Sequence, residues 1–274
     1  MGLHESDSVP GLTNRVVAKH AALVELAFEY AKQFFPAQTP TRVVGNPVRM
    51  AVITKETAAV SRQIFGLTDA KPILFIFGGS LGAERINYFF LENSEELLGN
   101  FEIIHQVGRA NYEGFKGEYE FMSKNYPEAV KANYRLIDYL DDQQMAAAYR
   151  AADLVVARAG SSIFEIAANG KPALLIPLPE AANNHQRENA YAFAAAGAGV
   201  VIEEENLLPA VFISQAKKIL QQKDVYEKMC QASAAFYKPE AAQHIAEDLI
   251  MVAGAASTKH ESPNSNFGFT NISV

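Results

Sequence analysis

The sequence predicts an α/β fold, a Rossmann-like, doubly wound sheet of mostly parallel strands. From residue 71 onward, short apolar runs alternate with helix-like segments through about six units. The runs at 73–77 and 154–156 are continuously apolar, as expected for strands that helices cover on both faces. A glycine-containing turn follows each of these two runs. This alternation implies right-handed crossovers between parallel strands.

Composition limits the class of protein. The chain has 274 residues, of which 49% are hydrophobic and 20% charged, enough for one large or two moderate domains. The formal net charge of −7 argues against a nucleic-acid partner, since such domains usually carry a basic face. A single cysteine, Cys230, excludes an internal disulfide and fits a reducing compartment. The sequence has neither a signal-peptide pattern nor the apolar run of roughly 18 residues that a membrane-spanning helix needs, so we expect a cytoplasmic protein.

The first part of the chain, residues 1–48, predicts a short helix at 9–18, strands at 23–28 and 42–44, and a helical turn at 29–35. A free-standing doubly wound domain normally begins with a strong strand and a glycine-rich turn. Here the first residues are polar instead. We therefore interpret this part as the end of a preceding domain.

The remaining elements follow in regular order. The expected strands are 73–77, 101–107, 134–137, 154–156, 173–177 and 200–202. The expected helices are 84–98, 112–125, 142–152, a segment carrying Glu165, 190–196, 207–222, 224–236 and 241–252. Residues 257–274 are rich in Ser, Asn and Gly, and they predict a disordered tail.

Ligands of such sheets bind outside the carboxyl ends of the strands, where three turns stand out. The first contains Gly78, Gly79 and Ser80. The glycines let the backbone approach an anion, Ser80 offers a hydroxyl, and the following helix offers its positive end. The motif is weak on its own, and a plain tight turn is the alternative.

The second turn, residues 158–162, leads into a helix that carries Glu165. Its carboxylate can accept both hydroxyls of a ribose, although a solvated helix residue favoured by the helix dipole is the alternative. The third turn, residues 183–186, carries amides and an imidazole that suit the hydroxyls of a sugar. Arg49 can neutralise a phosphate or make an ordinary surface ion pair. Together these turns favour a nucleotide site.

Six motifs in order extend this interpretation: GLTNRVVAKHA, GNPVR, FGGSLGAERIN, YLDDQQMAAAYRAADLVVARAG, FEIAANGKPALLIPLP and NHQRENA. Their order closely resembles the MurG family of bacterial hexosyltransferases, over about residues 4–250. The resemblance implies the GT-B fold of two Rossmann-like domains. It also implies transfer of N-acetylglucosamine from UDP-N-acetylglucosamine to undecaprenyl-diphospho-muramoyl-pentapeptide, which converts lipid I to lipid II in peptidoglycan synthesis at the cytoplasmic membrane surface.

The resemblance also implies roles for single residues. Arg49, Ser80, Glu165 and Gln186 match family positions that contact UDP-N-acetylglucosamine, and Leu140 matches one whose backbone reads the uracil. The turn and helix start that hold the nucleotide correspond to Ser161, Ser162, Ile163, Phe164 and Glu165.

Asp7 replaces an amide that contacts the donor in the family. A carboxylate beside a diphosphate weakens binding unless Arg49 or a proton compensates. In the implied reaction, a hydroxyl of the acceptor attacks the anomeric carbon with inversion as UDP leaves. Helix N-termini, Ser80 and Arg49 would stabilise the growing charge, since the sequence shows no metal cluster and implies no cofactor. Glu5 is the candidate for acid–base catalysis, and a merely solvated carboxylate is the alternative.

The predicted organisation is a remnant of a second Rossmann-like domain, which binds the acceptor, at 1–48, a UDP-sugar-binding domain at 49–256, and the tail at 257–274. The glycine-rich GGTGGH loop and membrane-docking apolar patch of the family's first domain do not occur in the sequence, so we expect about a hundred residues to be missing before Met1. Two alternatives remain. The chain can be a donor-binding subunit that needs a separate acceptor-domain partner chain, or a related glycosyltransferase with another lipid acceptor.

Overall fold

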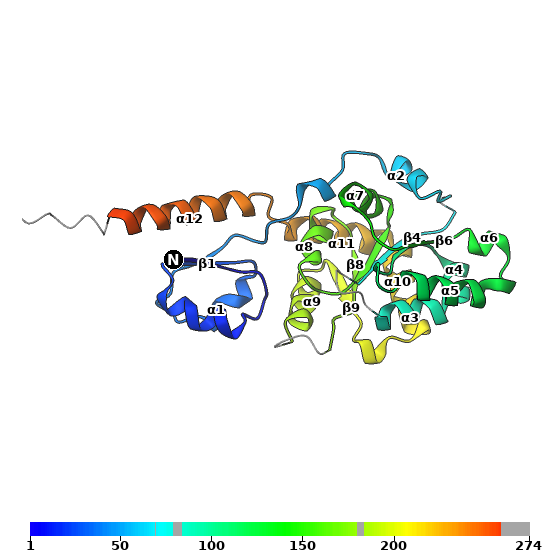
Figure 1. The fold of residues 1–274 in the computed structure, drawn as a ribbon, viewed down its shortest axis with the longest axis horizontal. Helices are drawn as coiled ribbons and strands as arrows, with labels where there is room; N and C mark the ends of the chain where they lie inside the picture. The colour runs from blue at the N-terminus through cyan, green and yellow to red at the C-terminus, as the bar shows by residue number, and fades with distance from the viewer. Residues whose placement is uncertain (69, 79–83, 180–183, 259–274) are drawn as a thin grey trace, which may run out of the picture.

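The computed structural model describes residues 1–68, 70–78, 84–179 and 184–258, and these form two lobes with parallel sheets (Figure 1). The smaller sheet has the order β1-β2-β3, and the larger has the order β6-β5-β4-β7-β8-β9. The small-sheet strands are β1 (Gly2–Glu5), β2 (Leu23–Leu26) and β3 (Thr41–Val43). The large-sheet strands are β4 (Ile73–Phe77), β5 (Glu102–Gln106), β6 (Tyr134–Ile137), β7 (Leu154–Ala157), β8 (Ala173–Leu175) and β9 (Gly199–Val201).

The larger sheet confirms the predicted doubly wound topology. All five neighbouring pairs of its strands are parallel. The chain runs outward from β4 through β5 to β6 and then returns to β7 on the other side of β4. Strand order therefore reverses between β4 and β7, and the crevice at such a reversal is where these sheets bind ligands.

Helices cover both faces of the larger sheet, which explains why β4 is apolar at every position. Ile73, Phe75 and Phe77 belong to one core, whereas Leu74 and Ile76 belong to the other. This alternation follows from the two-residue period of a strand. The first core is completed chiefly by α7, α8 and α9, and the second by α3, α4, α5 and α10.

The helices have the following bounds. The α-helices are α1 (Leu12–Val17), α2 (Ala58–Ile64), α3 (Glu84–Glu92), α4 (Ser94–Asn100), α5 (Tyr112–Met122), α6 (Glu128–Lys131), α7 (Asp142–Ala151), α8 (Ser162–Ala168), α9 (His185–Ala195), α10 (Pro209–Gln221), α11 (Lys223–Phe236) and α12 (Ala241–Thr258). The 3₁₀ turns are η1 (Ala18–His20), η2 (Glu29–Phe34), η3 (Met50–Val52), η4 (Ser123–Asn125) and η6 (Glu204–Asn206).

Several elements differ from the sequence-based expectation. The single helix predicted at 84–98 is two helices. The helix is interrupted at Asn93, whose side-chain amide donates to the carbonyl oxygen of Phe89 at 2.8 Å. Helix α9 begins five residues before the expected start at 190, after Asn184 in the left-handed conformation at φ 56°. Strand β1 was not predicted. Its sequence GLHE carries little apolar signal, and the strand is defined by its backbone pairing with β2.

The last helix packs on the small lobe rather than on the larger one. Helix α12 contacts β1 and β2, and Figure 1 shows it running beside them. Arg42 of β3 donates to both carboxylate oxygens of Asp248 of α12, at 2.7 and 2.9 Å. Residues 257 and 258 of the predicted tail continue this helix, and the rest of that tail lies outside the described residues. The chain therefore returns to its first sheet in the last described helix.

Asn189 of α9 joins the two lobes. Its Oδ1 accepts hydrogen bonds from the backbone N–H and the hydroxyl of Ser8, both at 2.8 Å. Its Nδ2 donates to Asp7 at 2.8 Å and to the carbonyl oxygen of Ala159 at 3.2 Å. One buried side chain thereby fixes the end of the small lobe against the turn that follows β7. In the described part of the chain, no helix has the length and apolarity needed to cross a bilayer.

Candidate functional site

A cavity of about 350 Å³ lies where the strand order reverses, at the carboxyl ends of β4, β5 and β7. It is lined by Arg49, Phe77, Gln106, Tyr139, Leu140, Met145, Ser161, Ser162 and Glu165. Five of the residues predicted from the sequence therefore line one cavity. Phe77 and Gln106 are the last residues of their strands, so the fold places them there directly.

Glu165 and Arg49 form the charged centre of this cavity. Arg49 donates from Nε to Oε1 of Glu165 at 2.8 Å and from Nη2 to Oε2 at 3.1 Å, a bidentate pair. A third donor of Arg49, Nη1, contacts Asp142 of α7 at 2.5 Å. The hydrogen bond to Glu165 is the main cause that raises the pKa of Arg49. Glu165, predicted to bind the ribose, and Arg49, predicted to bind a phosphate, thus bind each other in this structure.

Tyr149 of α7 is a further hydrogen-bond partner of Glu165. Its hydroxyl donates to Oε2 of Glu165 at 3.2 Å. Burial, and then the charge of Glu165, raise the pKa of Tyr149 well above its usual value. The phenol therefore stays protonated and remains a donor. The Glu165 side chain is only 14% exposed, and its carboxylate accepts from three donor atoms. These contacts hold the carboxylate in one orientation.

Leu140 and Gln106 lie next to each other in the lining of the cavity. The Leu140 side chain is buried, and its backbone N–H donates to Oε1 of Gln106 at 3.2 Å. Tyr139 also lines the cavity, with the Arg109 guanidinium 4.2 Å from its ring centre. Gln106 was missed by the sequence analysis. The signal that could have found it is a polar side chain at the end of a buried strand, at the ligand-binding edge of the sheet.

The start of α8 contributes mainly through its backbone. The side chains of Ile163 and Phe164 are buried in the core, so any contact of these two residues with a ligand is through main-chain atoms. The hydroxyl of Ser162 donates to the carbonyl oxygen of Arg158 at 3.3 Å, which ties the helix start to the preceding turn. Ser161 and Ser162 line the cavity directly.

Gln186 and Asp7 lie outside the lining of this cavity. Gln186, in the first turn of α9, accepts a hydrogen bond at Oε1 from the N–H of Leu178 at 3.2 Å. Asp7 comes from the small lobe and accepts from Nδ2 of Asn189 of the same helix. Helix α9 therefore carries Gln186 and, through Asn189, also holds Asp7. Ser80 of the glycine-rich turn lies outside the described residues.

Glu5 is buried, and both of its carboxylate oxygens accept hydrogen bonds. It is 2% exposed, and its two carboxylate oxygens accept from the N–H of Asp7 at 2.9 Å and from Nδ2 of Asn14 at 2.7 Å. These bonds hold the turn that carries Asp7. The role of Glu5 as an acid or base stays a prediction. No group of three metal-ligating His, Cys, Asp or Glu side chains occurs in the part of the chain that the structure describes.

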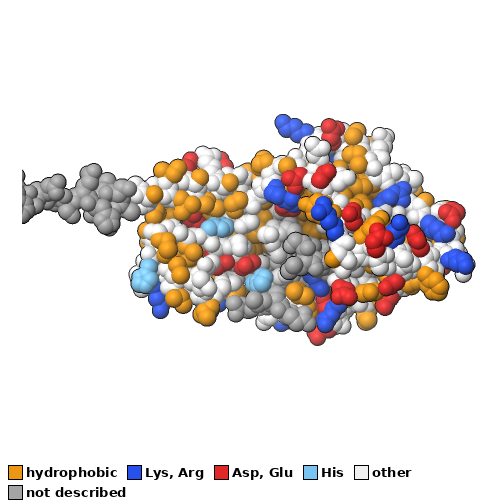
Figure 2. Space-filling view, in the orientation of Figure 1, with side chains coloured by type: hydrophobic (Ala, Val, Ile, Leu, Met, Phe, Trp, Pro, Cys, Tyr) orange, Lys and Arg blue, Asp and Glu red, His pale blue; other side chains and the backbone are white. Residues whose placement is uncertain are grey.

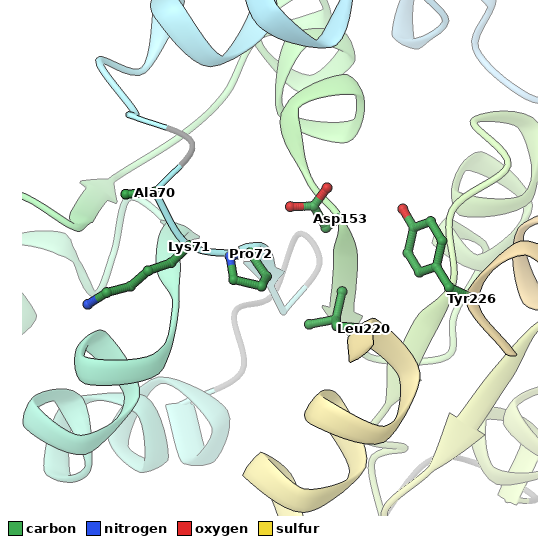
Figure 3. Close-up of a pocket in the computed structure, with 6 residues that line it drawn as sticks. All are labelled: Ala70, Lys71, Pro72, Asp153, Leu220 and Tyr226. Atoms are coloured by element: carbon green, nitrogen blue, oxygen red, sulfur yellow. The ribbon is translucent and has the colours of Figure 1, made fainter. Parts of the chain in front are cut away.

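A second cavity of about 350 Å³ lies at the opposite, amino-terminal ends of the strands, lined by Ala70, Lys71, Pro72, Asp153, Leu220 and Tyr226 (Figure 3). Asp153 accepts from Arg62 at one oxygen and from the N–H of Ile73 at the other, both at 2.8 Å. Lys71 donates to the carbonyl oxygen of Leu98 at 2.6 Å. The charged groups of this cavity thus serve the fold, and the carboxyl-end cavity is the better candidate.

Known proteins resemble this chain over both lobes. The profile of the glycosyltransferase family 28 C-terminal domain matches residues 73–245. The UDP-N-acetylglucosamine–N-acetylmuramyl-(pentapeptide) pyrophosphoryl-undecaprenol N-acetylglucosamine transferase of Caldicellulosiruptor saccharolyticus is 34% identical over 255 residues, which cover 89% of this chain and 64% of that protein. The protein of the same name from Chlorobaculum tepidum is 35% identical over 253 residues, covering 90% of this chain and 65% of its own. The chain thus spans just under two thirds of the length of these relatives.

Structural comparison agrees. The crystal structure of Acinetobacter baumannii MurG matches this structure with a TM-score of 0.68 and 28% sequence identity, covering 92% of this chain and 67% of that chain. This match confirms the expected Rossmann-like fold of the GT-B type. The profile, the sequence relatives and the fold all agree, and the chain belongs to glycosyltransferase family 28.

Proposed function

We propose that the chain binds UDP-N-acetylglucosamine in the carboxyl-end cavity and transfers N-acetylglucosamine to undecaprenyl-linked lipid I, giving lipid II. The observation that carries this proposal is Glu165, held by Arg49 and Tyr149 where the strand order reverses. A fixed carboxylate beside an arginine suits a ribose next to a diphosphate. The sequence relatives are named for this transfer, and the chain spans 64% of the first of them.

The bound donor would rearrange two contacts of the described structure. The uracil would take the N–H of Leu140 that now donates to Gln106, between the side chains of Phe77 and Met145. The ribose hydroxyls would take the oxygens of Glu165 that now accept from Arg49. Arg49 would then turn its guanidinium to the diphosphate, which carries more negative charge than one carboxylate. Arg49, displaced from Glu165, therefore gains a partner on the ligand.

In the proposed reaction, an acceptor hydroxyl attacks the anomeric carbon of the sugar, the bond from that carbon to the diphosphate breaks, and UDP leaves with inversion. Negative charge grows on the diphosphate as this bond breaks. Arg49, Ser80 and the backbone N–H groups at the start of α8 would stabilise that charge without a metal. Gln186 would bind the sugar, and Asp7 would approach the donor from the small lobe, where Glu5 is the candidate base.

A second candidate is a donor-binding subunit that works with a separate acceptor-domain chain. Two observations favour it. Strand β1 is an edge strand of the small sheet among the described residues, so its outer side can pair with a further strand. Helix α12 leaves Leu249, Ile250 and Met251 exposed, and Figure 2 shows apolar side chains gathered over the small lobe. In either case we propose that the protein acts peripherally at the cytoplasmic face of the membrane, where its acceptor, or a related lipid acceptor, resides.

Calorimetry with UDP-N-acetylglucosamine, paired with a lipid I transfer assay, tests these proposals. We expect the wild-type chain to bind the donor and Glu165→Ala to lose binding by more than about tenfold, since hydrogen bonds to a charged group contribute about 1.5–3 kcal/mol. Glu95→Ala on the surface of α4 is the matched control and should bind like the wild type. Binding without transfer would select the subunit candidate, and unchanged affinity in Glu165→Ala would overturn the site.

A further inference from the structure

Arg158 is a buried cation next to the donor site. It directly follows β7 and is 7% exposed. Its Nη1 donates to the carbonyl oxygens of both Ile176 and Pro177 at 3.0 Å, and its Nη2 lies 2.5 Å from Oε2 of Glu204. A buried guanidinium is tolerated only when its donors are satisfied in this way. These donors therefore fix the chain where it leaves β8.

The peptide between Pro177 and Leu178 is held from both sides. Its carbonyl oxygen accepts from Arg158, and its N–H donates to Oε1 of Gln186 at 3.2 Å. This peptide is trans and planar, so its carbonyl and N–H point in opposite directions and cannot turn independently. The position of Arg158 on one side therefore sets the direction of the N–H that orients the Gln186 amide on the other.

Glu204 of η6 holds Arg158 in turn. The Glu204 side chain is 7% exposed, and its second oxygen pairs with Arg85 of α3 at 2.6 Å. The contact with Arg158 is an ion pair rather than an aligned hydrogen bond, since Oε2 has no partner that meets hydrogen-bond geometry. The neighbouring Glu203 accepts from Arg187 and Tyr191 of α9, both at 2.8 Å. Turn η6 thus fastens Arg158 and the helix that carries Gln186 to each other.

We propose that Arg158, held by Glu204, is a positioning residue that orients the carboxamide of Gln186 toward the N-acetylglucosamine of the donor. The inference rests on the proposed function, because it assigns Gln186 to the sugar. Oε1 of Gln186 is engaged by Leu178, so Nε2 is the atom that turns to the sugar hydroxyls. Arg158 itself lies behind this contact and acts through one peptide unit.

This arrangement predicts different effects of Arg158 on the binding of the two parts of the ligand, the UDP and the sugar. UDP contacts the 350 Å³ cavity, whose lining residues do not include Arg158 or Gln186. Loss of Arg158 should therefore weaken binding of UDP-N-acetylglucosamine but leave binding of UDP nearly unchanged. A purely structural role for Arg158 would instead lower the melting temperature and change the two affinities alike.

The experiment measures the Kd of UDP and of UDP-N-acetylglucosamine for Arg158→Met, Gln186→Ala and the double variant. We expect each single variant to lose about tenfold for the sugar nucleotide and less than about twofold for UDP. The double variant should lose no more than either single variant, because both remove the same contact. Equal losses for both ligands, or losses that multiply in the double variant, would overturn the proposal.

Two controls keep the test decisive. Arg62→Met removes another largely buried arginine, paired with Asp153 at the opposite ends of the strands, and should lower stability without changing the ratio of the two affinities. Arg158→Met combined with Glu204→Gln avoids an unpaired buried charge if the single variant folds poorly. The side-chain amide NMR signals of Gln186 in the ligand-free protein give a readout that needs no binding, and they should shift in Arg158→Met.

The outcomes separate this inference from the proposed function. If the wild type binds neither ligand, the proposed function fails, and Gln186 signals that are unchanged in Arg158→Met would also refute the link between the two residues. If the wild type binds UDP-N-acetylglucosamine but Arg158→Met keeps the wild-type ratio of affinities, the proposed function stands and the positioning role is refuted.

Discussion

Arg49 competes with the proposed donor for Glu165. The bidentate pair of the described structure must open before ribose hydroxyls can reach the carboxylate. Arg49→Ala should therefore lower the affinity for UDP by about tenfold or more, because charge-assisted hydrogen bonds to the diphosphate are lost. The same variant should bind uridine, which has no phosphate, at least as tightly as the wild type, because Glu165 no longer has to be released. Calorimetry with both ligands checks this, and an equal loss for uridine and UDP would contradict it.

Single residues of the site were predictable where chemistry and turn position coincide. Glu165 and Arg49 stand beside turns at the carboxyl edge, and the structure brings them together. The pairing itself was open, because a surface ion pair and a phosphate contact use the same arginine. Gln106 and Arg158 escaped prediction for a different reason. Their roles depend on backbone groups of Leu140, Ile176 and Pro177, whose directions a sequence does not specify.

The contact between α12 and the small sheet contains a pair of buried carboxyl groups. Glu25 of β2 faces Asp248 of α12, with Arg42 of β3 beside both and His4 as its register neighbour on β1. Burial first, and then the charge of Asp248, raise the pKa of Glu25 to about 7. Its proton is therefore held more tightly in the folded chain than in the unfolded chain, where the pKa of this carboxyl has its ordinary value of 4.5.

This raised pKa gives stability a definite dependence on pH. The contribution of Glu25 is fully present below about pH 4.5 and is lost as the pH rises toward about 7. Glu25→Gln, which stays neutral, should reduce the decline of the unfolding free energy across this range, by at most about 1.4 kcal/mol per pH unit for one proton. Denaturant unfolding at several pH values measures the slope. Glu247→Gln on the exposed side of α12 is the control, and an unchanged slope in Glu25→Gln would refute the assignment.

Elements were predictable in proportion to their apolar periodicity. Strand β4 is buried at all five positions and was predicted with its observed bounds. Strand β1 was missed because its pairing uses the backbone, and only Glu5 of its four residues is buried. The packing of α12 against β1 and β2 was also beyond the sequence, because an apolar helix face does not identify the sheet that it covers.

At the scale of the whole molecule, the two lobes meet at a buried amide and at the ring of Phe28, which packs edge-on against Phe164 and Phe236. Asn189 accepts from Ser8 and donates to Asp7 and to the carbonyl oxygen of Ala159, so it joins the small lobe to the turn before α8. The order of motifs resembles a family with two Rossmann-like domains, and the larger sheet has the expected topology. The role of Asn189 at the junction was not predicted, because it depends on Asp7 and Ser8, which are distant from Asn189 in the sequence.

Asn189→Ala should loosen this junction. It leaves the N–H of Ser8 without its acceptor, which costs about 1–3 kcal/mol of stability for a buried donor. Amide hydrogen exchange should then rise at residues 7–8, and the radius of gyration from X-ray scattering should increase as the lobes separate. Asn133→Ala removes an amide that donates to Leu98 within the larger lobe, so it should lower stability without either change. Unaltered exchange at residues 7–8 in Asn189→Ala would show that other contacts, such as the packing of Phe28 against Phe164, hold the lobes together.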